Sequence, residues 1–285
     1  MTKLKSRTYL LALLPFVFIV LVFELVPLAT VVLRSFFPTG EIGFTLEHFA
    51  SIFTKKLYRD AVINSVLLAL ASALIGIVAA FFGAKAAYHS SGRARSFFMS
   101  ILNMTSNFAG IPLAFSYIIL LGSTGVLVLL GKSWGIQALA GYNVYSFSGL
   151  LLTYIYFQIP LATILLIPAF DALHKEWRES VNLLGGGSYT YWVRVGIPVL
   201  LPSLLGTLSI LFSNAIAAYA TAYALLGGNY SLLPIRISEQ FAGDVVQHKE
   251  FGSALAVMLM LLMVLATTLN NHLLKKSSAK EGGNG

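Results

Sequence analysis

Charged residues and cysteine are what this sequence has least of. Asp, Glu, Lys and Arg make up only 11% of its 285 residues, whereas a soluble domain usually carries about 25%. Cysteine is absent, which excludes a disulfide framework, thiol chemistry and a cysteine metal site. The phosphate-binding pattern G-x-x-x-x-G-K-[ST] is also missing. Any nucleotide hydrolysis linked to this chain must therefore take place in another chain.

Catalytic and metal-binding patterns are missing as well. The sequence contains neither an H-E-x-x-H pattern nor a defensible Ser/His/Asp arrangement. Its histidines are scattered over expected loops and helix ends, and we interpret them as solvated side chains; they are His48, His89, His174, His248 and His272. We expect no catalytic residue, no metal ligand and no cofactor in this chain. A membrane-embedded enzyme is disfavoured for the same reason.

Apolar residues dominate what is present. They form 57% of the chain, and its mean hydropathy is +0.81. About 20 consecutive apolar residues suffice to cross a bilayer, and six runs reach that length. They cover residues 9–33, 61–88, 96–121, 147–170, 198–226 and 251–274. The first run is too long for a secretory signal and lacks an A-x-A cleavage site, so we expect a retained span.

The basic residues predict an orientation. Six spans place both termini on one side, and the loops on that side contain 12 of the 19 Lys and Arg residues. The other side holds seven: Arg34, Lys55, Lys56, Arg59, Lys132, Arg236 and Lys249. Because cytoplasmic loops are enriched in Lys and Arg, we expect both termini in the cytoplasm. The net charge of +8 is explained by this bias. It forms no clustered patch for nucleic acid.

The expected organisation is a cytoplasmic N-terminus (1–8), a six-span membrane domain (9–274) and a polar cytoplasmic tail (275–285) that we expect to be irregular. Within the outer connection after the third run, residues 125–139 predict a short interfacial helix. No internal repeat is evident, which disfavours an inverted-repeat secondary transporter.

The longest polar interruption lies at about 173–197, on the predicted cytoplasmic side. Trp177, Val181 and Leu184 are spaced i, i+4 and i+7, which places them on one face of a helix. The glycines at 185–187 then favour a sharp bend. Pro198 suits the first turn of the next helix, where its missing N–H costs little.

This stretch resembles the EAA loop of ATP-binding-cassette (ABC) importer permeases. The family pattern has Glu-Ala-Ala, then a Gly after three residues, then an aromatic and an apolar ending with Pro. The matching positions here are Glu179, Ser180, Val181, Gly185, Gly186, Trp192 and Pro198. Ser180 and Val181 replace the usual alanines, and Gly186 replaces a common alanine. In that family the loop is a coupling helix that docks in a cleft of a cytoplasmic ATPase.

The resemblance implies a fold, a location and partners. The fold would be the all-α, six-span type I importer permease, in the plasma (inner) membrane. The partners would be a second, different permease subunit, two ATP-binding subunits that hold ATP and Mg, and an extracytoplasmic substrate-binding protein. Membrane lipid surrounds such a protein, and nucleic acid takes no part. For Glu179 the plain alternative is an ordinary carboxylate at a helix start, favoured by the helix dipole.

Several polar residues lie inside the apolar runs. Polar side chains in hydrocarbon usually face the bundle interior or a water-filled path, although they also join helices by hydrogen bonds. The candidates for a translocation path are Asn103, Ser106, Asn107, Ser213, Asn214 and Thr221, and packing is an equal explanation for them. Thr105 lies among them. Glu24 is the single acid within a run, toward the outer part of the first span. Its carboxylate either pairs with a nearby basic residue in a structural role or belongs to a path for cations.

The solute is the least determined feature. The first span and the segment FAGIPLAFSYIILLGSTG look most like permeases of the spermidine/putrescine cluster, which also contains iron(III), thiamine and aminoethylphosphonate systems. We therefore expect a polyamine, with iron(III), thiamine or aminoethylphosphonate as alternatives. A secondary transporter or channel is the alternative from another class. A secondary transporter or channel would need buried charges for ion coupling, and Glu24 is the single acidic residue within the apolar runs.

Overall fold

The structure is a computed structural model that describes residues 13–40, 43–242 and 248–281. Every regular element within these ranges is a helix. Six helical segments of the described chain are long and apolar enough to cross a membrane: Leu13–Arg34, Lys56–His89, Ile111–Ser133, Phe147–Ala172, Ser188–Ile216 and Lys249–Leu274. The expected all-α, six-span architecture of a multi-pass membrane protein is therefore confirmed.

The centre of the bundle is a long helix, α4 (Lys56–His89), against which α9 (Phe147–Leu166) and α12 (Ile197–Ile216) pack. Apart from Leu68, the buried residues of α4 are small; they are Ala61, Ser65, Ala69, Ser72, Ala73, Gly76, Ala80, Ala84 and Ala87. Small residues allow helix backbones to approach closely in a membrane. At Gly76, an added Cβ would lie 3.0 Å from the Cβ of Gln158. α4 therefore packs through its alanine and glycine face.

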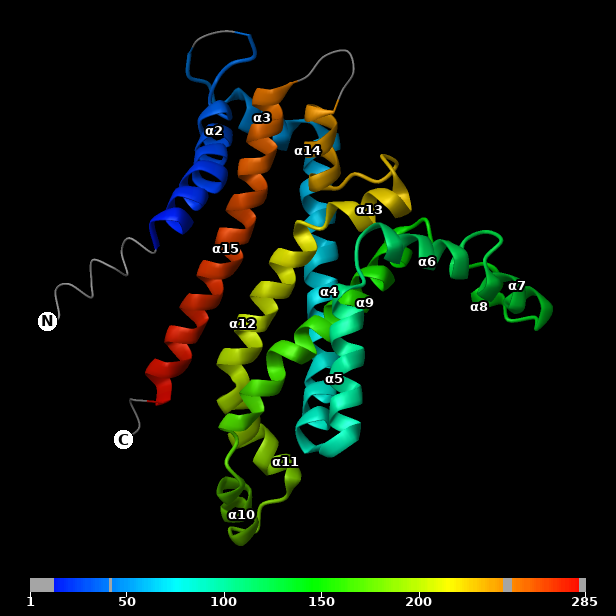
Figure 1. Ribbon diagram of the computed structural model, residues 1–285, viewed down its shortest axis with the longest axis vertical. Helices are drawn as coiled ribbons and strands as arrows, with labels where there is room; N and C mark the ends of the chain where they lie inside the picture. Colours follow the sequence, from blue (N-terminus) through cyan, green and yellow to red (C-terminus); the bar gives the residue numbers. More distant parts are fainter. Residues whose placement is uncertain (1–12, 41–42, 243–247, 282–285) are drawn as a thin grey trace, which may run out of the picture.

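The remaining helices extend the bundle toward its two ends (Figure 1). We call the two ends of the bundle the α14 end and the α10 end. At the α14 end lie α3 (Glu47–Thr54) and α14 (Leu233–Phe241). The helix that ends in α2 (Val26–Arg34) packs along α15 (Lys249–Glu281). α15 continues to Glu281, so the tail expected to be irregular from residue 275 is helical over its first part.

The third predicted span is wrong as a single helix. The chain forms α5 (Gly92–Asn107) and α6 (Ile111–Leu121), separated by residues 108–110. Gly110 has φ +76°, a conformation that favours glycine, and Pro112 in the first turn of α6 cannot continue a preceding helix. The membrane-length apolar stretch is instead Ile111–Ser133. It includes α7 (Val126–Ser133); with α8 (Gln137–Ala140), the stretch expected to form one short interfacial helix contains two short helices.

Figure 1 shows α6, α7 and α8 leaving the side of the bundle, roughly across the axis of α4. They remain attached through α13 (Tyr219–Leu226), which packs on α6. The hydroxyl of Thr221 on α13 accepts a hydrogen bond from the Gly110 N–H at 2.9 Å. The break before α6 is thus fixed by a residue more than a hundred positions further along the chain.

The fifth predicted span is also interrupted. α12 ends at Ile216 and α13 begins at Tyr219, with Ala218 in an extended conformation between them. The Ala218 carbonyl accepts a hydrogen bond of 2.6 Å from the hydroxyl of Tyr154 on α9. A buried side chain therefore satisfies a backbone group that the break leaves without a helical partner.

Two helices contain a wider π-helical turn, and each turn precedes a proline. η1 (Leu21–Leu25) lies before Pro27, and η3 (Trp192–Gly196) lies before Pro198. A proline ring clashes with the carbonyl four residues earlier in a regular α-helix. In both helices that carbonyl belongs to the π-turn, which relieves the clash while the helix continues.

Candidate functional site

The polar stretch at 173–197 forms the α10 end of the molecule. α9 passes into a 3₁₀ helix, η2 (Ile167–Ala172), and the chain then enters α10 (Lys175–Leu183). After a turn at 185–187, the short helix α11 (Ser188–Tyr191) leads through η3 into α12. Figure 1 places α10 and α11 beyond the ends of the packed helices. None of the residues of α10 is buried.

The turn after α10 is a Schellman C-cap. The Gly186 N–H donates to the Val181 carbonyl at 2.8 Å, and the Gly185 N–H donates to the Asn182 carbonyl at 3.0 Å. Gly185 has φ +77°, which favours glycine. A Cβ at Gly186 would lie 2.7 Å from Cγ1 of Val181. Two of the three glycines are therefore required by the turn, whereas a Cβ at Gly187 meets nothing within 4 Å.

The predicted helix face is present in the structure. Trp177, Ser180, Val181 and Leu184 line one shallow groove of about 380 Å³ together with residues at the start of the next helix, which are Arg194, Val195, Pro198 and Val199. The groove thus brings together Val181 and Pro198, two residues selected by the motif. The Ser180 hydroxyl donates to the Glu176 carbonyl at 2.8 Å, within α10.

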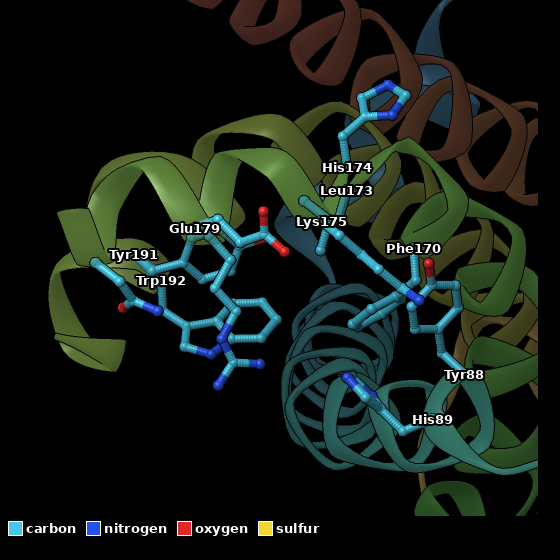
Figure 2. Close-up of a pocket in the computed structure, with 11 residues that line it drawn as sticks. Tyr88, His89, Phe170, Leu173, His174, Lys175, Glu179, Tyr191 and Trp192 are labelled. Atoms are coloured by element: carbon cyan, nitrogen blue, oxygen red, sulfur yellow. The ribbon is translucent and has the colours of Figure 1, made fainter. Parts of the chain in front are cut away.

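Glu179 lies on another side of α10 and borders a cavity of about 600 Å³ (Figure 2). In the close-up, Glu179 and Lys175 approach the cavity from α10, whereas Tyr88 and His89 border it from the end of α4. Arg178 and His174 add further basic groups to the lining. The cavity combines aromatic walls with a predominance of basic groups, a lining suited to acidic or polar groups of a partner.

Trp192 connects this segment to the bundle. Its ring packs edge-on against Phe81 of α4, with centroids 5.5 Å apart, and lies at 6.4 Å from Phe170 of η2. Lys85 Nζ lies 4.5 Å from the centre of the same ring, within range of a cation–π interaction. A Cβ at Gly196 would lie 2.6 Å from the Trp192 ring. The aromatic position of the motif therefore anchors η3 to α4 and η2.

Sequence reasoning placed Leu184 on the shared face of α10 but missed two other highly exposed apolar side chains of this segment, Leu183 and Tyr189. Leu183 and Leu184 are each 88% exposed, and Tyr189 is 82% exposed. They lie at the end of α10 and in α11, which project from one end of the bundle (Figure 1). The Leu-Leu pair before three glycines could have identified Leu183, which lies off the face that Trp177, Val181 and Leu184 share.

The residues predicted for a translocation path do not gather at one place. Ser106 Oγ and Asn107 Nδ2 both donate to the Asn103 carbonyl, at 3.1 and 2.8 Å, at the exposed end of α5. Ser213 and Asn214 border a groove beside α15. Thr221 is buried and bonded to Gly110. A path role remains a prediction for all six.

Glu24 lies in η1, near the middle of the first described span, with its side chain exposed on the surface of the helix. Neither an ion pair nor a hydrogen bond of its carboxylate occurs within the described residues. Among those residues, no group of three or more acids and histidines could hold a metal ion.

This geometry defines a class: a helical membrane protein with a polar loop that projects from one end. The comparisons specify it further. No family model matches the chain. Sequence similarity connects it to the thiamine transport system permease protein ThiP of Escherichia coli, at 28% identity over 160 residues, which is 56% of this chain and 30% of that protein. A Haemophilus influenzae protein described as a ferric transport system permease, FbpB 1, is 22% identical over 90% of this chain and 40% of its own length.

Solved structures show the same fold. A chain of the bacterial ABC transporter that imports the acidic polysaccharide alginate superposes with a TM-score of 0.75 and 18% identity, over 96% of this chain and 98% of that chain. A chain of the MetNI methionine ABC transporter gives a TM-score of 0.57 and 14% identity, over 78% and 95% of the two chains. The homologues of the chain are permease proteins of ABC transporters, and its fold is that of type I ABC importer permeases. It spans less than half the length of these curated relatives.

Proposed function

We propose that this chain is a permease subunit of an ATP-driven importer and that the polar stretch at 173–197, which we call the α10 loop, couples it to a separate cytoplasmic ATPase. The observation that carries the proposal is the α10 loop. Its tip exposes Leu183, Leu184 and Tyr189 to solvent, while its base is tied to the bundle by Trp192. An exposed apolar tip marks a protein contact, and an anchored base allows that contact to move the spans.

The α10 loop offers the partner three chemically different surfaces. The apolar tip suits a hydrophobic cleft. Glu179 suits a basic group beside that cleft, and the neighbouring cavity with Lys175 and Arg178 suits acidic groups. ATP and Mg belong to the ATPase in this scheme, and this chain supplies no catalytic group. The remaining partners in the proposal are a second permease subunit, a second ATP-binding subunit and an extracytoplasmic binding protein.

The orientation that follows has the α10 end and both termini in the cytoplasm. It is supported by the distribution of Lys and Arg described above. Six spans and the similarity to ABC permeases support a multi-pass protein of the inner membrane.

The solute we propose is thiamine, in place of the polyamine expected from the sequence. Seven of the relatives found by sequence are thiamine transport permeases, from several bacteria. Iron(III) is the second candidate, because the ferric relative aligns over 90% of the chain.

The test is purification of the tagged chain from its native cell in mild detergent, with identification of the proteins that come with it. We expect a nucleotide-binding ATPase, and we expect Glu179→Lys to remove it while the chain still inserts in the membrane. A matched control is Glu176→Lys, one turn earlier on the same helix, at a position that borders neither the cavity nor the groove. A chain that purifies without an ATPase would contradict the proposal.

The solute is tested separately in membrane vesicles that contain the complex. We expect ATP-dependent uptake of labelled thiamine that excess unlabelled thiamine abolishes and spermidine leaves unchanged. Uptake of an iron(III) chelate under the same conditions would replace thiamine with the second candidate and would leave the coupling role intact.

A further inference from the structure

The cavity beside Glu179 has features that docking of an ATPase does not require. It encloses about 600 Å³ between α10, η2 and the end of α4, and we call it the α10 cavity. Part of its wall is aromatic, with Tyr88 from α4, Phe170 from η2 and Trp192 from η3 (Figure 2). Small ligands occupy cavities of about 300–1,000 Å³. The α10 cavity therefore has the size of a ligand site, larger than one acidic side chain of a partner protein would fill.

The length of α4 places the α10 cavity at the level of the lipid headgroups. α4 has 34 residues and belongs to a candidate membrane span. At 1.5 Å per residue it is about 50 Å long, whereas a bilayer with its headgroups is about 40–45 Å thick. The last turn of α4, which contains Tyr88 and His89, therefore lies among the headgroups of one leaflet. Tyr and Trp are enriched at this level, in agreement with Tyr88, Tyr191 and Trp192 in the lining.

The charges in the α10 cavity are not balanced. Lys175 and Arg178 line it from α10, and Glu179 is the only acid among the described residues of the lining. Lys175 and Glu179 are one helical turn apart, yet they form no ion pair. Neither Lys175 nor Arg178 has an acidic partner in the part of the chain that the structure describes. A cleft lined by charges of one sign raises the local concentration of counter-ions, so this cavity favours an anion.

The hydrogen-bond donors of the cavity select the kind of anion. α10 begins at Lys175, and its N-cap residue His174 makes no side-chain cap hydrogen bond. Both residues line the cavity, so the first backbone N–H groups of α10 lie beside it, and such groups bind phosphate. The planar guanidinium of Arg178 presents paired donors that match two phosphate oxygens. A phosphate has more acceptor oxygens than a carboxylate and can use all of these donors together.

We propose that the α10 cavity binds a phosphate ester, with Lys175, Arg178 and the start of α10 around the phosphate and the aromatic wall around its substituent. Two sources share this chemistry: the headgroup of an anionic phospholipid and a soluble phosphate ester. Basic pockets at the cytoplasmic side of membrane helices bind anionic headgroups. The proposal rests on the proposed function for the cytoplasmic placement of the α10 end. It also deepens that function, because a ligand that contacts both α10 and α4 would tighten the connection between the coupling loop and the bundle.

The first arm of the experiment tests the lipid source. The full chain is reconstituted in nanodiscs that contain equal amounts of phosphatidylglycerol and phosphatidylcholine with the same acyl chains. Native mass spectrometry then measures which lipid stays bound when the protein is released. Because two basic groups face the ligand, we expect phosphatidylglycerol to be retained roughly tenfold more often than phosphatidylcholine.

The second arm tests the soluble source. The same chain in nanodiscs of phosphatidylcholine alone is titrated with glycerol 3-phosphate, while chloride keeps the ionic strength constant. A ligand that binds the folded chain raises its melting temperature with concentration, so binding appears as a rise that exceeds the effect of chloride. Retention of phosphatidylglycerol identifies the lipid headgroup as a ligand, and a response to glycerol 3-phosphate alone identifies the soluble ester.

Matched double substitutions assign the binding to the cavity. Lys175→Gln with Arg178→Gln should bring the lipid preference close to parity and abolish the response to glycerol 3-phosphate. Both positions are exposed, so loss of binding at an unchanged melting temperature without ligand is not a folding defect. The control is Arg93→Gln with Arg95→Gln, which removes two exposed charges at the start of α5, outside the cavity lining. This control should bind like the unsubstituted chain.

Three results would overturn the proposal: no binding in either arm, binding that survives in the Lys175 and Arg178 variant, or binding that the control pair loses equally. If neither arm shows binding and the Lys175 and Arg178 variant instead loses the ATPase, the cavity receives an acidic group of that partner. Both arms are measured on this chain without an ATPase. A purification that yields no ATPase therefore contradicts the coupling role and leaves the phosphate site standing, so the two failures are distinguishable.

Discussion

Lys85 Nζ of α4 lies 4.5 Å from the centre of the Trp192 ring at the base of the α10 loop. The two residues are more than a hundred positions apart in sequence, and their contact connects the loop directly to the longest helix of the bundle. If an ATPase moves the α10 loop, this contact transmits the movement to α4.

Lys85→Met should weaken this connection while preserving most of the side chain's apolar length. A cation–π contact contributes about 0.5–2 kcal/mol, so we expect a small fall in thermal stability and a several-fold fall in uptake. The ATPase should still co-purify, because the tip of the loop is unchanged. Lys132→Met on α7, far from the loop, is the control for loss of a positive charge. Equal uptake by the two variants would show that Trp192 is held by its aromatic neighbours alone.

The glycines of the turn should differ in their tolerance of alanine. Gly185→Ala forces an alanine into a left-handed conformation, at a cost of about 1–2 kcal/mol, and Gly186→Ala places a Cβ against Val181. Both should lower uptake and recovery of the ATPase. Gly187→Ala is the matched control, since its Cβ meets nothing within 4 Å. We would measure the three side by side; a defect of Gly187→Ala as large as the others would contradict the C-cap argument.

Leu184→Ser should separate docking from folding. The side chain is 88% exposed, so its loss should leave the melting temperature in detergent within error. If the tip enters a cleft of the ATPase, burial of a leucine contributes about 1.5–3 kcal/mol, and retention of the ATPase should fall at least tenfold. Leu46→Ser, an exposed leucine near the α14 end, is the control. Undiminished ATPase binding by Leu184→Ser would exclude the tip from the contact.

Thr221 offers a test of structure against solute path. Thr221→Val keeps the shape but removes the acceptor of the Gly110 N–H, and an unsatisfied buried donor costs about 1–3 kcal/mol. Thr221→Ser retains the acceptor. We therefore expect a lower melting temperature for the valine variant only, with uptake falling in proportion to stability. A change in solute preference at unchanged stability would instead favour a path residue.

The sequence was sufficient to predict the class of fold and the α10 loop, for definable reasons. Apolar runs of membrane length set the number of spans, and the spacing of Trp177, Val181 and Leu184 set the shared face of α10, which the structure confirms. Both signals are local, so neither depends on how distant segments pack. The roles of Glu179 and of the other motif residues in coupling remain predictions.

The breaks in the third and fifth predicted spans were missed because they are stabilised by tertiary contacts. Gly110 and Pro112 were visible in the sequence, but hydropathy continues through them. The hydrogen bond from Gly110 to Thr221 and the bond from Tyr154 to Ala218 join segments that no local pattern connects. The burial of Asn270 was missed for the same reason: only the packing of α12 against α15 shows that its Oδ1 atom is buried without a hydrogen-bond partner among the described residues.

The π-turns before Pro27 and Pro198 also affect how the helices can change in length. A π-turn closes its hydrogen bond over five residues and an α-turn over four, so each of these turns stores one surplus residue. Deleting one residue from Trp192–Gly196 would leave an ordinary α-turn and keep the faces of α12 in register, but it would restore the clash with the Pro198 ring that the π-turn relieves. The same deletion one turn later, inside α12, would rotate every following side chain by about 100°, given 3.6 residues per turn. In the described part of the chain, these two π-turns are thus places where a membrane helix can lose one residue while the faces of the following turns stay in register.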